Sequence, residues 1–153
     1  MYSRRQASRM SFVAIIVVAA AAMTGCGMMN QQSNMAAFTT QLRSSNEVPP
    51  VASAGSGSVD AVLNKDTNLL RWKVNYSGLS GPASAGHFHG PAAVGANAGV
   101  AVPWQSPVSS PMEGSVTLTA AQAADLMAGR WYANIHTAAN PGGELRGQMT
   151  IRN

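Results

Sequence analysis

Hydrophobic and polar residues alternate with a period of two along most of the chain after Phe38. The clearest example is NLLRWKVNY (68–76), in which one face carries Leu70, Trp72, Val74 and Tyr76. The segment ELRGQMTI (144–151) alternates in the same way, and its apolar face carries Leu145, Met149 and Ile151. This period is typical of half-buried strands in an antiparallel sheet.

Six weaker segments show the same pattern and are separated by turn sequences such as NKDTN and NPGG. We predict strands at residues 37–42, 56–63, 83–89, 99–102, 114–117 and 130–136. Many short strands at this spacing predict an all-β fold, either a β-sandwich or a Greek-key barrel.

One short helix is predicted at the sequence TAAQAADLMAG. Thr119 is suited to the N-cap, Gln122 completes a capping box three residues later, and Gly129 is suited to end the helix. We expect Leu126 and Met127 to pack the helix against one end of the sandwich.

The composition agrees with a small β-rich domain. At 153 residues the chain has room for one domain with a modest core. Only 10% of the residues are charged, and the 15 Gly and 8 Pro fit numerous turns. Three of the ten basic residues, Arg4, Arg5 and Arg9, precede an apolar run, and without them seven basic residues stand against six acidic ones. We therefore expect no nucleic-acid partner.

The first 26 residues have the anatomy of an export signal. The basic residues precede an apolar run from Phe12 to Met23, and the sequence MTGC follows. MTGC resembles the bacterial lipobox, and this resemblance implies that Cys26, the only cysteine, is diacylated and becomes the new N-terminus. The alternative is an ordinary signal peptide that is cleaved nearby.

We accordingly predict a signal peptide at residues 1–25, a flexible tether at 26–37 that begins at the lipidated Cys26, and a folded domain at 38–153. The acyl chains would anchor the exported chain to the bacterial cell envelope. Gly27 after the cysteine favours the outer membrane, on its periplasmic side, if the host is Gram-negative. The lipid bilayer is the one partner that the sequence predicts. The sequence identifies no protein partner.

Three motifs follow one another in the predicted domain: NEVPP (46–50), GHFHG (86–90) and NIHTAANPGGELRG (134–147). Together they resemble the CHRD (chordin) domain, and the resemblance extends over roughly Phe38–Ile151. It implies an immunoglobulin-like Greek-key β-sandwich, similar to copper/zinc superoxide dismutase. The family carries no settled biochemical activity, so the resemblance bears on the fold more than on the function.

The chain has three histidines, which are His87, His89 and His136. His87 and His89 are two residues apart on a predicted strand and share one face, while Phe88 between them is expected to point into the core. On the strand at 130–136, Ile135 is expected to face the core, which leaves His136 outside. The three imidazoles are therefore expected to gather outside the core, beneath the loop of residues 90–113.

Two interpretations of this cluster stay open. The first is a metal site for copper or zinc, because imidazole binds both ions. The second is structural, with the histidines bonded to the backbone of the loop and with Asn134 and Thr137 in the same polar network. A dinuclear copper/zinc centre is excluded, because it needs more imidazoles than the chain contains.

Further charged residues are expected near the histidines. Glu47 is predicted to pair with Arg146 and so to tie the first strand to the last, with a solvated, unpaired charge as the alternative. Glu144 and Arg146 are two residues apart and are expected to share the polar patch of the histidines. The sequence contains no pattern typical of a catalytic nucleophile, so no catalytic residue is predicted.

Two functions are compatible with these features. The favoured one is a non-catalytic, envelope-anchored CHRD-domain lipoprotein for binding or envelope structure, with room for one copper or zinc ion. The alternative is a mononuclear copper protein, either a superoxide dismutase-like enzyme or a copper chaperone, with His87, His89 and His136 as ligands. The metal content of the purified domain separates the two.

Overall fold

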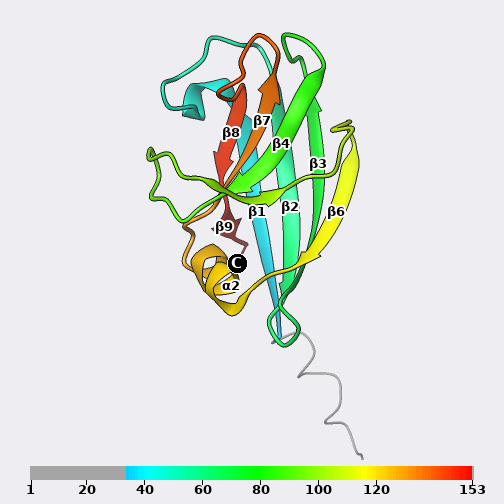
Figure 1. Cartoon of the computed structure of the whole chain (residues 1–153), viewed down its shortest axis with the longest axis vertical. Coiled ribbons are helices and arrows are strands. Elements are labelled where there is room, and N and C mark those ends of the chain that lie inside the picture. The colour runs from blue at the N-terminus through cyan, green and yellow to red at the C-terminus, as the bar shows by residue number, and fades with distance from the viewer. Residues whose placement is uncertain (1–33, 153) are drawn as a thin grey trace, which may run out of the picture.

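The computed structural model describes residues 34–152, which form one curled antiparallel sheet and a short helix (Figure 1). Cys26 and the predicted signal peptide lie outside the described residues. Within residues 34–152, no helix is long and apolar enough to span a membrane. In chain order the elements are β1 (Met35–Arg43), η1 (Ser44–Asn46), β2 (Ser56–Asn64), β3 (Leu69–Ser77), β4 (Ala83–His89), β5 (Val100–Pro103), β6 (Met112–Thr117), α2 (Ala120–Met127), β7 (Tyr132–Thr137), β8 (Leu145–Gln148) and β9 (Thr150–Ile151).

The strand order is β5-β4-β7-β8-β1-β2-β3-β6, with β9 paired to β1, and the pairings are antiparallel. The sheet consists of two halves, β1-β2-β3-β6 and β5-β4-β7-β8, which join where Arg43 of β1 pairs with Arg146 of β8. It curls so that the inner faces of both halves enclose one core. The prediction of an all-β, sandwich-like fold with one short helix is thus confirmed.

Phe88 of β4 lies among the large aromatic side chains of the core. The centroid of its ring is 5.3 Å from that of Trp72, 5.2 Å from that of Trp104 and 5.9 Å from that of Trp131. All four residues are at most 6% exposed. Because Trp72 belongs to one half of the sheet and Phe88 to the other, burial of these rings holds the two halves together.

The strands agree with the predicted segments to within two residues at each end, with one exception in the C-terminal segment. β1 begins two residues before the predicted strand, so residues 35 and 36 of the predicted tether pair with β2. The C-terminal segment is not one continuous strand, because Met149 interrupts it and donates its N–H to Trp131 O at 2.9 Å. After this break only β9 continues along β1, and Ile151 is 44% exposed instead of facing the core.

Helix α2 begins with the predicted capping box. The Gln122 N–H donates to Thr119 Oγ1 at 3.2 Å, and the Thr119 N–H donates to Gln122 Oε1 at 2.9 Å. Leu126 is buried, as predicted, but Met127 is 36% exposed. Ala123 is buried in its place, because residues three apart lie on the same side of a helix and Ala123 shares the side of Leu126.

Gly114 of β6 gives a direct test of the packing between strands. A Cβ added there would lie 2.3 Å from Cζ2 of Trp72, so Gly114→Ala is expected to lower the free energy of unfolding by about 1–3 kcal/mol. Gly81→Ala is the matched control, because nothing lies within 4 Å of its added Cβ, and its effect should stay within about 0.5 kcal/mol. Urea denaturation measures both, and equal stabilities would show that Trp72 does not pack as described.

Candidate metal centre

Strands β4 and β7 are adjacent in the sheet (Figure 1). The three histidines lie on one face of this pair of strands. Phe88 of β4 and Ile135 of β7 point into the core, where they are 1% and 0% exposed. Because alternate residues of a strand point to opposite faces, the outer face receives His87, His89 and His136. The arrangement is the one that the alternation predicts, and we call these three residues the histidine site.

The imidazole nitrogens of the histidine site lie close enough to share one metal ion. His87 Nδ1 is 3.1 Å from His136 Nε2, and one ring nitrogen from each of the three residues lies within 4.8 Å of the others. Two nitrogens bound to one zinc ion at about 2.0–2.1 Å are about 3.4 Å apart. The most distant pair therefore has to approach by about 1.4 Å, which is within the reach of side-chain rotation.

Backbone carbonyls fix the protonation of two of the rings. His89 Nδ1 lies 3.0 Å from Ala98 O, and His136 Nδ1 lies 3.0 Å from Pro141 O. Since a carbonyl oxygen only accepts hydrogen bonds, both Nδ1 atoms carry a proton, and in the neutral ring Nε2 keeps a lone pair. On His136 this lone pair accepts a hydrogen bond from His87 Nδ1 at 3.1 Å. His89 Nε2 is buried and has no hydrogen-bond partner among residues 34–152. A metal ion would satisfy this nitrogen.

Burial favours the neutral form of the His87 and His89 rings. It lowers the pKa of His87, and the neighbouring His136 and His89 lower this pKa further. The pKa of His89 is lowered mainly by burial, with smaller contributions from His136 and Arg146 and against the opposing effect of the Ala98 hydrogen bond. Neutral imidazole is the form that binds a metal ion, so both rings are competent ligands at neutral pH.

A stack of side chains supports the histidine site on the side of β8. The Tyr132 ring is parallel to that of His89, with centroids 4.8 Å apart, and the Arg146 guanidinium lies 3.6 Å from the centroid of the Tyr132 ring. Arg146 also donates to Asn97 Oδ1 at 2.6 Å and to Ala96 O at 2.5 Å. Sequence reasoning missed Tyr132 as a site residue, although its even spacing from His136 on β7 places both on one face.

Glu47 does not form the predicted ion pair with Arg146. Its carboxylate accepts a hydrogen bond from Asn134 Nδ2 at 2.5 Å, whereas the Arg146 guanidinium is turned toward Tyr132 and the loop above it. Burial raises the pKa of Glu47 to about 7, although Asn134 and Arg146 act in the opposite direction. The tie to the last strands comes instead from Asn46, whose side-chain amide donates to Arg146 O at 3.1 Å.

Two of the three sequence motifs meet at this point of the structure. NEVPP contributes Glu47, and NIHTAANPGGELRG contributes Asn134 and Gly143. Gly143 has a φ of +131°, and a Cβ there would lie 2.6 Å from Glu47 Oε1 and from Asn134 Nδ2. The close approach of the three chain segments therefore requires glycine.

Glu144 belongs to a second polar cluster and not, as predicted, to the patch of the histidines. Its carboxylate accepts from Ser53 Oγ at 2.6 Å, from Ser80 N and Oγ at 2.8 and 2.6 Å, from Thr137 Oγ1 at 2.6 Å and from Asn140 Nδ2 at 3.1 Å. Burial alone would raise the pKa of Glu144, but the hydrogen bonds outweigh it and hold this pKa at about 2. Thr137 bonds to Glu144, so the structure contains two polar clusters where one network was expected.

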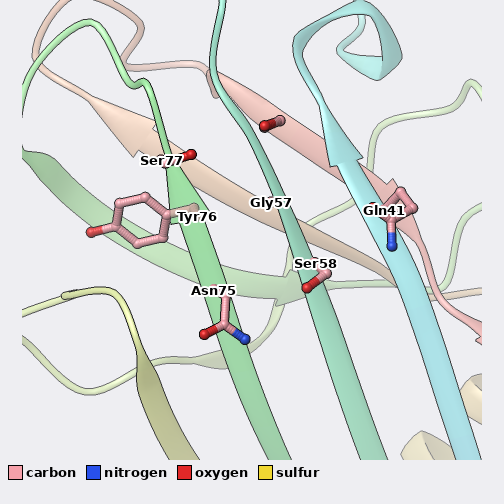
Figure 2. A pocket seen from close by; sticks show the side chains of 7 residues that line it. Gln41, Gly57, Ser58, Asn75, Tyr76 and Ser77 are labelled. Atoms are coloured by element: carbon pink, nitrogen blue, oxygen red, sulfur yellow. The ribbon is translucent and has the colours of Figure 1, made fainter.

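A separate hollow of about 300 Å³ lies on the outer face of β1, β2 and β3 (Figure 2). Its lining is polar and uncharged and consists of Gln41, Ser56, Gly57, Ser58, Asn75, Tyr76 and Ser77. The Tyr76 hydroxyl donates to Val108 O at 2.8 Å and is already engaged. The hollow offers no carboxylate, imidazole or thiol, so the histidine site is the stronger candidate for metal binding.

The curled antiparallel sheet and the polar site on its outer face define an all-β, sandwich-like domain. The family model described as the CHRD domain matches residues 38–149, a range that contains the histidine site, Glu47 and Glu144. The chain belongs to the CHRD domain family, as the three motifs predicted. Searches of curated proteins and of solved structures found no match.

The buried carboxylate of Glu144 gives the second prediction. Glu144→Gln removes the charge and replaces one acceptor with a donor, so the free energy of unfolding at pH 7 should fall by about 2 kcal/mol. Because folding lowers the pKa of Glu144 from 4.5 to about 2, the advantage of the wild type is complete above pH 4.5 and is lost as the pH falls toward 2. Urea denaturation across this range measures the difference.

Glu113→Gln is the control for this variant. Glu113 is exposed and lies 3.6 Å from Lys73 Nζ, so its replacement should change stability by no more than about 0.5 kcal/mol. A stability difference between the wild type and Glu144→Gln that does not vary with pH would contradict the proposed hydrogen bonding.

Proposed function

We propose that the chain is an exported, lipid-anchored protein of the bacterial envelope whose CHRD domain binds one zinc or copper ion without catalytic turnover. The proposal depends on one observation. One ring nitrogen from each of the three imidazoles lies within 4.8 Å of the others, and backbone carbonyls bonded to Nδ1 of His89 and His136 leave Nε2 as the ligand atom of these two rings. The carbonyl hydrogen bonds on Nδ1 of His89 and His136 orient these two rings, and Nε2 of His89 has no partner among residues 34–152. Nε2 of His136 accepts a hydrogen bond from His87 Nδ1 at 3.1 Å, so a bound ion replaces this one hydrogen bond.

The burial of the site supports a retained ion. His89 and His136 are 8% and 9% exposed, and the loop that contains Ala98 lies against His89. The nearby Arg146 is 3% exposed, and its guanidinium is engaged with Tyr132 and with the backbone of the same loop. This cation is therefore poorly placed to draw an anionic substrate toward the ion.

The anchor at Cys26 is supported by the sequence alone, since this residue lies outside the described part of the chain. The fold is compatible with a tether at that end. β1 starts at Met35 beside the turn between β2 and β3, where Lys65 N donates to Asn34 O, and it ends at Arg43 beside η1. An anchored domain would thus carry Glu47 and its surroundings at the end farther from the membrane.

Metal content is the test of the proposed site. The purified full chain is expected to retain about one zinc or copper ion, and His87→Ala and His136→Ala should each weaken zinc binding by at least about 100-fold. Asn75→Ala is the control, because it removes a polar side chain from the outer face of β3 and leaves the histidine site intact. A wild-type chain that holds no ion at micromolar free metal would overturn the proposal.

The second candidate, a mononuclear copper enzyme or chaperone, is favoured by the number of ligands. The cluster contains three imidazoles and no fourth His, Cys, Asp or Glu from residues 34–152. Three protein ligands leave a coordination position open for a substrate. The test of this candidate is superoxide consumption by the copper-loaded chain, with His87→Ala as control. Consumption by the wild type alone supports the copper enzyme. If the chain retains copper but consumes no superoxide, the non-catalytic function is supported.

The lipid anchor has a test of its own. Cys26→Ser removes the thiol that would be acylated, so this variant should incorporate no labelled fatty acid and should leave the membrane fraction. Its thermal stability should match that of the wild type, because Cys26 is not part of the sheet or of the helix of residues 34–152. Continued fatty-acid labelling of the variant would argue against acylation at Cys26.

A further inference from the structure

The backbone N–H and C=O of Ala98 are held by two side chains at the histidine site. Its carbonyl accepts from His89 Nδ1 at 3.0 Å and from the Tyr132 hydroxyl at 3.3 Å. Its N–H donates to the same Tyr132 oxygen at 3.2 Å. The backbone atoms of Ala98 therefore set both the orientation of the His89 ring and the position of the loop that consists of residues 90–99.

Tyr132 is itself held on both sides. β7 lies between β4 and β8, so His89 of β4 stacks on one side of the Tyr132 ring and Arg146 of β8 approaches from the other. Arg146 donates in turn to Ala96 O and Asn97 Oδ1, which belong to the same loop. The loop over residues 90–99 thus has a second attachment to the same stack.

We propose that Tyr132 is a positioning residue that couples an ion in the histidine site to the loop over residues 90–99. This inference rests on the proposed function. His89 can direct Nε2 at the ion only while its Nδ1–H remains on Ala98 O, and the Tyr132 hydroxyl keeps Ala98 in place. Such coupling is reciprocal. The loop strengthens ion binding when Ala98 is bonded to His89 and Tyr132, and the ion stabilises this bonded position of the loop by the same factor.

The coupling has a consequence at the molecular surface. The loop carries Val94, which is 80% exposed, together with the exposed Gly95 and Ala96. Release of Ala98 would free this part of the loop from its attachment to β7. The occupancy of the buried site therefore controls the mobility of an exposed apolar segment.

The test uses the full chain in detergent, with Zn²⁺ as the probe. Tyr132→Phe keeps the ring and removes the hydroxyl, and it should weaken zinc binding by about tenfold. In the wild type, saturating zinc should slow hydrogen exchange at the Ala98 amide by about tenfold. In Tyr132→Phe this effect of zinc should be largely lost.

Tyr76→Phe is the matched control, because it also removes a hydroxyl that bonds to a loop carbonyl, that of Val108. It should leave both the zinc affinity and the exchange at Ala98 unchanged, even if it lowers thermal stability as much as Tyr132→Phe does. The exchange measurement on the wild type, with and without zinc, needs no variant and so does not depend on the folding of one.

The outcomes separate this inference from the proposed function. The coupling is wrong, and the metal site stands, if the wild type binds zinc but two results contradict the inference. The first is a zinc affinity of Tyr132→Phe within about twofold of that of the wild type, and the second is hydrogen exchange at Ala98 that zinc leaves unchanged in the wild type. If the wild type binds no zinc or copper, the proposed function and the coupling are overturned together.

Discussion

The antiparallel register of β4 against β7 is the constraint on which the rest of the structure depends. It places Phe88 and Ile135 in the core and therefore sends His87, His89 and His136 to the outer face. A slip by one residue would exchange the two faces, burying imidazoles and exposing a phenyl ring that packs against three tryptophans. The burial of Phe88 thus fixes the position of the candidate ligands, and hydrophobic packing is the origin of the polar site.

The loops, and not the strands, provide the hydrogen bonds that orient the histidine rings. Two loop carbonyls, from Ala98 and Pro141, place the proton of His89 and of His136 on Nδ1. Nε2 of His89 then has no partner among residues 34–152, and Nε2 of His136 accepts from His87 Nδ1. The carboxylates of Glu47 and Glu144 hold the neighbouring loops in place, in environments that move their pKa values in opposite directions. Burial dominates at Glu47, whereas at Glu144 hydrogen bonds from Ser53, Ser80 and Thr137 outweigh it.

The strands and the capping box could be predicted because both are local patterns, in which alternation or a spacing of three determines the structure. The hydrogen-bond partners of Glu47 and Glu144 could not be predicted in this way. Glu47 bonds to a residue 87 positions away and Glu144 to one 91 positions away, and these pairings depend on how loops from different strands converge. Pairing Glu47 with Arg146 by charge alone was wrong, because Arg146 is engaged by Tyr132 and by loop acceptors.

The ring nitrogens of the histidines give the most direct measurement of the central claim. In ¹⁵N NMR spectra of the metal-free chain at neutral pH, Nδ1 of both His89 and His136 is predicted to carry a proton, and Nε2 of His89 is predicted to carry none. Addition of zinc should then shift Nε2 of both rings and one nitrogen of His87 at a single stoichiometric equivalent. Protons on Nε2 of His89 and His136, together with ring resonances that do not respond to zinc, would contradict the account.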